Sequence, residues 1–297
     1  MKRVPTLRQL QYFLALTETE HFGRAAERCF VSQSAFSNAI RELETQLGAE
    51  LVDRTNRSVT ITATGQEVAV QARLVLRDVE DLVETARGPV EPLTGELRLG
   101  VIPTIAPFIL PVALPKLREA YPQLVLLLTE DQTDRVYRRL MDGELDVLLL
   151  ALPWEMRGVE KLELFNDAFC LACREGTTRV DPENYRFNRL DADSILLLED
   201  GHCLRDHALA ACKIRATEKV LRFGASSLLT LIEMVDADLG ITYLPEMAHG
   251  SALLRNTRVR LWPIGESSYR TIGLVWRKGS RRIEEFRLLG KFLSKHR

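Results

Sequence analysis

An excess of charge of either sign is missing from this sequence, because 40 Lys and Arg residues face 41 Asp and Glu residues and leave a net charge of −1. A polycation that binds nucleic acid through its overall charge is therefore excluded, and any such binding requires a local patch. The Gly-x-Gly-x-x-Gly, P-loop and His-Glu-x-x-His motifs are also missing. Dinucleotide, nucleotide and zinc-protease sites of these types are excluded with them.

Long apolar segments are missing as well. Residues 1–5 carry two basic side chains and no apolar signal region, and no stretch approaches the roughly 18 apolar residues of a membrane-spanning helix. We therefore expect a cytoplasmic protein without a membrane partner. With 297 residues, 46% of them hydrophobic, the chain can bury a substantial core and is predicted to form two or three domains.

Cysteine is scarce, with five residues in the chain. Cytoplasmic thiols are kept reduced, so we expect no structural disulfide framework, and a close pair there is more typical of redox chemistry. Cys170 and Cys173 form a lone Cys-x-x-Cys whose sulfurs would lie on opposite faces of a strand. We interpret this pair, and Cys29, as packing residues, and we expect neither a metal site nor a cofactor.

The remaining cysteines, Cys203 and Cys212, lie in a segment that also holds two His, one Arg and several acidic residues. The run 195–198 is apolar and strand-like, and the Leu- and Ala-rich composition after Gly201 favours helix, which places Cys203 in a helix's first turn. Backbone N–H groups and the helix dipole at that position stabilise a thiolate, the reactive form of cysteine.

A single helix through both cysteines would separate their sulfurs by about 14 Å along the axis and by about 180° around it. A disulfide needs Cα atoms within about 7 Å. Bonding them would therefore require the helix to unwind, which is the behaviour of a switch. The alternative is two unrelated core cysteines, since free cysteine is commonly a small buried hydrophobe. The residues alone leave both interpretations open.

The N-terminal third predicts two short helices and then a third helix over 31–43 with one apolar face. Its opposite face is short and polar, with one basic residue, at i, i+3, i+4 and i+7: Ser34, Ser37, Asn38 and Arg41. Such side chains can reach base edges and phosphates, as in a helix-turn-helix, although a solvated face has the same pattern. The basic stretch 53–62, which predicts a wing able to touch phosphates, favours DNA binding.

A long helix is predicted over residues 64–87, because Thr64 to Glu67 have capping-box spacing. Its apolar residues recur every three or four positions and form a seam: Val68, Ala72, Val75, Val79 and Leu82. The seam can pack on the chain's own core or on a second copy. We favour a dimerising linker, because the helix is long and thinly apolar. Gly and Pro residues beyond it predict a hinge over 88–95.

The C-terminal two thirds alternate strand-like and helical runs, which predicts a parallel sheet covered by helices. We expect a regulatory domain over 96–297, with subdomain I at about 96–165 and 268–297 and subdomain II at about 166–267. Ligands of such sheets collect beyond the carboxyl ends of strands, where Thr104, Thr133 and Cys203 lie. Cap or turn duty is the ordinary alternative for the two threonines.

Several runs of the N-terminal third resemble LysR-type transcriptional regulators: Ala25-Ala26, Val31 to Ser37, Ile40 to Glu44 and Leu47-Gly48. Ser34 stands where that family often has proline. The resemblance implies an all-α winged helix-turn-helix domain over 1–63, a long linker helix, and an α/β regulatory domain of two Rossmann-like, periplasmic-binding-protein-like subdomains. It also implies DNA-binding residues: Arg8, Ser32, Gln33, Ser34, Ser37, Asn38, Arg41, Arg54 and Arg57.

Gly201 to Asp206, together with Cys212, is similar to the peroxide-sensing members of this family. The resemblance implies that Cys203 attacks hydrogen peroxide and becomes a sulfenic acid, and that Cys212 then forms a reversible disulfide with it. It implies a peroxide site of six residues: Thr104, Thr133, His202, Arg205, Asp206 and Arg270. Refolding of the 203–212 segment would remodel a tetramer, a dimer of dimers, on promoter DNA and so control antioxidant genes.

The partners implied by this resemblance are double-stranded promoter DNA, RNA polymerase, and glutaredoxin or thioredoxin as reductant. The chain is expected not to be an enzyme. One alternative is a LysR-type regulator that senses a small metabolite in the cleft, with incidental cysteines. Another is a thiol peroxidase-like enzyme, against which the helix-turn-helix argues. His207 and the Cys170/Cys173 pair receive no role from the resemblance.

Overall fold

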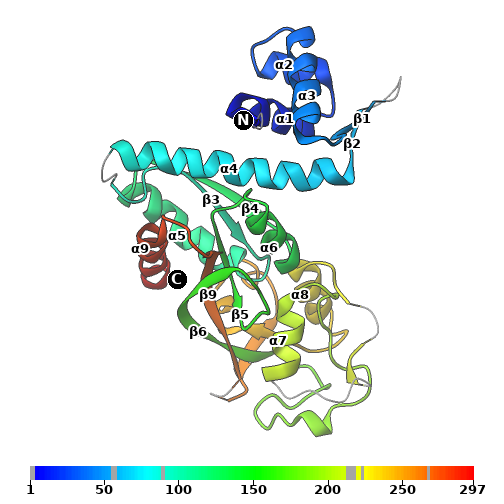
Figure 1. Cartoon of the computed structure of the whole chain (residues 1–297). Helices are drawn as coiled ribbons and strands as arrows, with labels where there is room; N and C mark the ends of the chain where they lie inside the picture. The colour runs from blue at the N-terminus through cyan, green and yellow to red at the C-terminus, as the bar shows by residue number, and fades with distance from the viewer. Residues whose placement is uncertain (1–3, 55–58, 88–90, 212–218, 222–223, 266–267) are drawn as a thin grey trace. The chain divides into compact units, whose positions relative to one another are not determined.

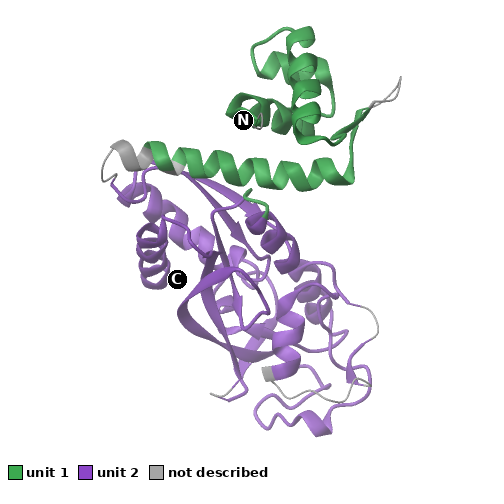
Figure 2. Ribbon diagram, viewed as in Figure 1, with its two compact units in different colours: residues 1–90, 142–144 green, residues 91–141, 145–297 purple. Residues whose placement is uncertain are grey.

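The computed structural model describes residues 4–54, 59–87, 91–211, 219–221, 224–265 and 268–297. The chain divides into two compact units, coloured separately in Figure 2. Unit 1 comprises residues 1–90 with 142–144, and unit 2 comprises residues 91–141 with 145–297. Among the described residues, no helix combines the length and the apolarity that crossing a membrane requires. The finer domain boundaries given above stay predictions.

Unit 1 begins with three helices, α1 (Leu7–Thr19), α2 (Phe22–Arg28) and α3 (Gln33–Leu47). Their shared core contains Phe13, Leu16, Phe36, Ile40 and Leu43, all fully buried. Strands β1 (Val52–Arg54) and β2 (Val59–Ile61) pair antiparallel, as expected of a wing. The apolar face expected on the third helix is found except at its end. Leu47, the last residue of α3, is 39% exposed.

Helix α4 (Ala63–Arg87) follows the wing and has 25 residues. It begins one residue earlier than predicted, because Thr62 caps it in place of Thr64. The Thr62 hydroxyl accepts a hydrogen bond from the Gly65 N–H at 2.9 Å. A side chain cannot replace glycine at this position, since a Cβ atom would lie 2.3 Å from the carbonyl oxygen of Leu51.

The seam predicted on α4 is only partly covered in the single chain. Ala72 is buried, whereas Val75 and Leu82 are 42% and 62% exposed, and the neighbouring Val83 is 44% exposed. Apolar side chains exposed at this spacing on one long helix form a surface suited to association.

Unit 2 is built on a seven-stranded sheet in the order β4-β3-β5-β9-β6-β7, with β8 also paired to β6 (Figure 1). The strands are β3 (Gly95–Val101), β4 (Leu124–Glu130), β5 (Val147–Leu152), β6 (Val159–Arg174), β7 (Thr242–Pro245), β8 (Val259–Pro263) and β9 (Tyr269–Arg277).

The predicted parallel sheet is correct only for β3, β4 and β5. Strand β9, from the C-terminal part of the chain, lies between β5 and β6 and runs antiparallel to both. The apolar run 195–198 is also not a regular strand. It makes isolated parallel bridges, from Ile195 to Val220 and Ile241 and from Leu198 to Ala225.

The helices of unit 2 are α5 (Ala106–Ala120), α6 (Thr133–Met141), α7 (Cys203–Ala211), α8 (Leu228–Asp236) and α9 (Ile283–Lys295), with short 3-10 helices η1 (Phe187–Arg189) and η3 (Glu246–Ala248). Helices α5 and α9 pack side by side against the sheet (Figure 1). Apolar patterns predict helices over 114–120 and 137–141; α5 and α6 contain these runs but begin earlier, at residues 106 and 133.

Unit 2 contains two hydrophobic cores. The first gathers residues of β3, β5, β9, α5 and α9, and the second gathers residues of the far half of β6, β7, α8 and the 195–198 run. Helix α7 takes part in both, because Cys203 packs in the first core whereas Leu204 and Ala208 pack in the second. A change in the conformation of α7 therefore disturbs both cores at once.

Candidate functional site

Cys203 is the first residue of α7, which confirms the prediction that it lies in a helix's first turn. It is 2% exposed. The chain enters the helix through Gly201, whose φ of +96° lies where side chains are strongly disfavoured. A Cβ atom at Gly201 would also lie 2.9 Å from the side-chain oxygen of Gln132. Glycine is therefore needed to bring the cysteine to this position.

Four side chains influence the Cys203 thiol. Burial is the largest effect and raises the pKa of the thiol; the Thr133 hydroxyl, the Arg270 charge and the Thr104 hydroxyl oppose it, while the charge of Asp206 adds to it. The net direction is upward, so the thiol is protonated at neutral pH. The Thr133 hydroxyl is buried and forms no well-aligned hydrogen bond with any described group, so it can bind a small polar molecule beside the sulfur.

Arg270 organises one side of this site from within β9. Its side chain is fully buried, and its Nε donates a hydrogen bond to Asp167 Oδ2 at 2.9 Å. Nη1 donates to the Thr104 hydroxyl at 3.1 Å, and Nη2 donates to the Thr104 carbonyl at 2.9 Å. Because the Thr104 hydroxyl accepts from the guanidinium, its own hydrogen is left to donate toward the sulfur or a ligand.

Sequence reasoning missed Asp167. It lies in β6 directly opposite Arg270 in the strand register, and its second carboxylate oxygen accepts the Met247 N–H at 3.1 Å. Burial raises the pKa of this carboxyl group, and the Arg270 charge opposes that effect. A carboxylate in a mostly apolar strand was the available signal, since a buried acid requires a partner.

The structure thus brings Thr104, Thr133, Asp206 and Arg270 together around Cys203, and the six-residue peroxide site itself stays a prediction. His202 is buried directly before the helix. Arg205 instead directs its guanidinium to Asp200 at 3.1 Å and to the Leu198 carbonyl at 3.3 Å. Cys212 lies outside the described residues.

Cys170 and Cys173 are buried in β6. Burial, followed by nearby carboxylates, raises the pKa of Cys170 to about 11 and that of Cys173 to about 12. These pKa values disfavour the reactive thiolate form at neutral pH. Within the part of the chain that the structure describes, no three His, Cys, Asp or Glu side chains are grouped so that they could hold a metal ion.

Helix α3 presents the polar face that was expected to meet DNA. Gln33, Ser34, Asn38 and Arg41 are exposed, and Ser37 is half-buried. The Ser32 hydroxyl caps the helix, accepting the Ala35 N–H at 3.3 Å. The guanidinium of Arg8, from α1, lies 5.5 Å from the centre of the Tyr12 ring. Arg54 ends β1, and Arg57 lies outside the described residues.

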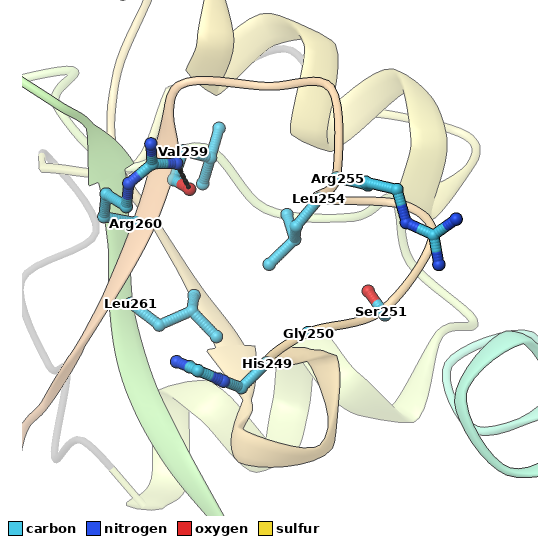
Figure 3. A pocket seen from close by; sticks show the side chains of 8 residues that line it. All are labelled: His249, Gly250, Ser251, Leu254, Arg255, Val259, Arg260 and Leu261. Carbon is cyan, nitrogen blue, oxygen red and sulfur yellow. Dashed lines mark hydrogen bonds between the residues drawn. The ribbon is translucent and has the colours of Figure 1, made fainter.

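A cavity of about 220 Å³ lies elsewhere in unit 2 (Figure 3). Its lining comes from residues 249–261 alone, and Leu254 and Leu261 point into it. Arg260 turns to backbone carbonyls, donating to Val259 O at 3.1 Å, and Arg255 points away. Its lining includes the charged residues Arg255 and Arg260 but none of the residues around Cys203.

Two family models match the chain. Residues 7–66 match the bacterial regulatory helix-turn-helix protein, lysR family, and residues 91–297 match the LysR substrate binding domain. The chain is 42% identical over 287 residues to the HTH-type transcriptional regulator EstR of Acinetobacter baylyi, covering 96% of this chain and 95% of that one. It is 41% identical over 274 residues to the DNA-binding transcriptional dual regulator OxyR of Escherichia coli, covering 92% and 90%.

The chain is also similar to solved structures of OxyR proteins. A full-length OxyR variant from Pseudomonas aeruginosa matches with a TM-score of 0.80 and 30% identity, over 98% of this chain and 95% of that one. The reduced regulatory domain of OxyR2 from Vibrio vulnificus matches with a TM-score of 0.67 and 40% identity, over 70% of this chain and 99% of that one.

Proposed function

Because the chain belongs to the LysR family of bacterial transcriptional regulators and is of the OxyR type, we propose that it controls transcription in response to hydrogen peroxide through Cys203. The observation that carries this proposal is the convergence of Thr104, Thr133 and Arg270 on one buried thiol. These residues come from segments far apart in the sequence. Two hydroxyl groups and one cation beside a sulfur suit a small molecule that both donates and accepts hydrogen bonds.

In the proposed reaction, Cys203 Sγ forms a bond to one peroxide oxygen while the O–O bond breaks. The departing hydroxide takes up a proton and leaves as water, and the cysteine becomes a sulfenic acid. Arg270 stabilises the developing negative charge, and Thr104 and Thr133 hold the peroxide with His202, Arg205 and Asp206 nearby. The Cys212 sulfur then displaces water from the sulfenic acid and forms the Cys203–Cys212 disulfide.

Disulfide formation is proposed to be the signal because it is incompatible with α7 as described. Nine sequence positions separate the two cysteines, which in a helix is far beyond disulfide reach. Unwinding α7 would free Cys203 from the first core and Leu204 and Ala208 from the second. The two subdomains can then change their relative orientation. In this way a local covalent change alters the whole regulatory domain.

We propose the remaining steps of the cycle by analogy with regulators of the OxyR type. Helix α3 reads promoter DNA in the major groove, α4 holds two chains together, and the tetramer changes the spacing of its DNA-binding domains on oxidation. RNA polymerase responds to that change in the cytoplasm, and glutaredoxin or thioredoxin resets the disulfide. The protein consumes peroxide once per cycle and so acts as a sensor, not as a peroxidase enzyme.

The test replaces Cys203 by Ser and compares DNA footprints with and without peroxide. The Cys203→Ser protein should bind DNA as the reduced wild type does and should show no peroxide-dependent change of footprint. Cys170→Ala is the matched control, because it removes a buried thiol outside the site and should leave the response intact. A Cys203→Ser protein that still responds to peroxide would refute the proposal.

A further inference from the structure

His207 lies one helical turn after Cys203 in α7 and is 9% exposed. Residues at i and i+4 share a helix face, with Cβ atoms about 5–6 Å apart. Helical side chains also lean toward the N-terminus, so the His207 ring leans toward the turn that begins with Cys203. The ring therefore lies on the same face of α7 as the Cys203 sulfur, the reactive atom of the proposed function.

The hydrogen bonding of His207 identifies its tautomer. Nε2 lies 2.9 Å from the Pro153 carbonyl oxygen, which can only accept, so Nε2 carries the hydrogen. In the neutral ring Nδ1 then presents a lone pair. This atom is buried and has no hydrogen-bond partner among the described residues. A buried acceptor without a partner is costly, and such a group commonly serves a ligand or a reaction.

Burial favours the neutral form of the ring. Burial is the main effect and lowers the pKa of His207; the positive Arg270 on β9 lowers it further, and the Pro153 carbonyl and Asp206 on α7 oppose this. The Cys203 thiol on the same helix face carries no charge at neutral pH, because burial raises its pKa. At pH 7 the site thus holds a protonated thiol and a free imidazole lone pair.

A protonated thiol must lose its proton to attack peroxide, because the thiolate is the nucleophile. The other neighbours of Cys203 are poor acceptors for that proton. Arg270 is a cation, and Thr104 and Thr133 are hydroxyl groups. An imidazole has a pKa close to the working pH, which suits general-base catalysis.

We propose that His207 Nδ1 is the proton acceptor for the Cys203 thiol in its reaction with hydrogen peroxide, a role that rests on the proposed function. The Sγ–H proton moves to Nδ1 as the sulfur forms its bond to the near peroxide oxygen. The O–O bond breaks, and the departing hydroxide takes the proton from Nδ1. Thiol and peroxide become sulfenic acid and water, and His207 is neutral again. Such contacts often shorten only when the substrate is bound.

The test measures the rate constant for Cys203 oxidation by peroxide in the full-length protein between pH 5 and pH 8. In the wild type the rate should rise with pH only until His207 is neutral, below about pH 6.5, and should then stay level. In His207→Gln it should be at least about tenfold lower at pH 7, because general-base catalysis is lost. It should also rise about tenfold per pH unit without levelling, since only the thiolate then reacts.

Glutamine can still donate to the Pro153 carbonyl but cannot take up a proton, so this variant separates proton transfer from packing. His249→Gln is the control, because His249 lines the cavity of Figure 3 and should leave rate and profile unchanged. Binding of reduced His207→Gln to DNA checks its folding.

The pH profile of the wild type tests the inference even if the variant folds poorly. A rate that rises tenfold per pH unit throughout the range would overturn the role of His207. So would a His207→Gln protein that keeps the level region and a rate within twofold of the wild type. A wild type whose Cys203 does not react at all would instead refute the proposed peroxide-sensing function.

Discussion

Arg270 and Asp167 show how single residues position the proposed site. Both side chains are almost completely withdrawn from solvent, so each charge depends on the other for compensation. The pair is formed by strand register, which sets position 167 opposite position 270. Its consequence is chemical, because the guanidinium held by Asp167 fixes both the hydroxyl and the carbonyl of Thr104 beside Cys203.

Replacing Asp167 by Asn should lower the free energy of unfolding by about 3–5 kcal/mol, because it leaves a buried guanidinium without a counter-charge. Urea unfolding followed by tryptophan fluorescence measures this, since all three Trp residues lie in unit 2. The double variant Asp167→Leu/Arg270→Met should lose less stability than the single variant, because both charges are removed. Equal stability of Asp167→Asn and wild type would contradict the account.

The two thiols of β6 should resist alkylation in the native protein at pH 7. With pKa values of about 11 and about 12, Cys170 and Cys173 are almost entirely protonated, and both are buried. Iodoacetamide labelling followed by mass spectrometry should modify them only after denaturation. Rapid labelling of either residue in the folded protein would show that the pair is accessible and would reopen a redox role for it.

Contacts between neighbouring residues could be predicted from the sequence, whereas contacts between residues far apart in the chain could not. Gly201, Cys203 and the Leu/Ala-rich stretch predicted the start of α7 because these signals are local. Asp167 and Arg270 are 103 residues apart. Nothing in the sequence near either residue identified its partner, since only the fold sets the register of β6 against β9.

Among the helices and strands, α7 was predicted correctly, whereas the direction of β9 was not. Composition predicted α7, whereas β9 was expected in a parallel sheet and is antiparallel to both neighbours. Strand direction depends on how the chain returns to the sheet, which apolar patterns do not encode. The prediction of a strand over 195–198 was also wrong. Its apolar residues are buried, as those of a strand would be, but they make only isolated bridges.

Helix α4 carries a prediction of its own about assembly. Replacing Val75 and Leu82 by Glu should prevent association of chains, because both side chains are exposed in the single chain and charges cannot be buried in an apolar seam. Light scattering should report a lower mass for this variant. Gln71→Glu is the matched control, since it places a charge at an exposed α4 position outside the seam. An unchanged mass for the double variant would locate the interface elsewhere.

For the whole molecule, near-neutral charge and a two-unit organisation fit a regulator that recognises DNA locally. The net charge of −1 gives no general attraction for DNA, so we expect the exposed polar face of α3 to supply the contact with DNA. The regulatory unit holds Cys203 where its two hydrophobic cores meet. In the proposed mechanism, a covalent change at Cys203 disturbs both cores and so changes the spacing of paired DNA-binding domains.

The most direct test of this account treats the reduced full-length protein with one equivalent of hydrogen peroxide and maps its thiols by mass spectrometry. We expect a Cys203–Cys212 disulfide within seconds, with Cys29, Cys170 and Cys173 still free. Thiols that stay free at both Cys203 and Cys212 would contradict peroxide sensing. They would favour instead a LysR-type regulator that responds to a small metabolite.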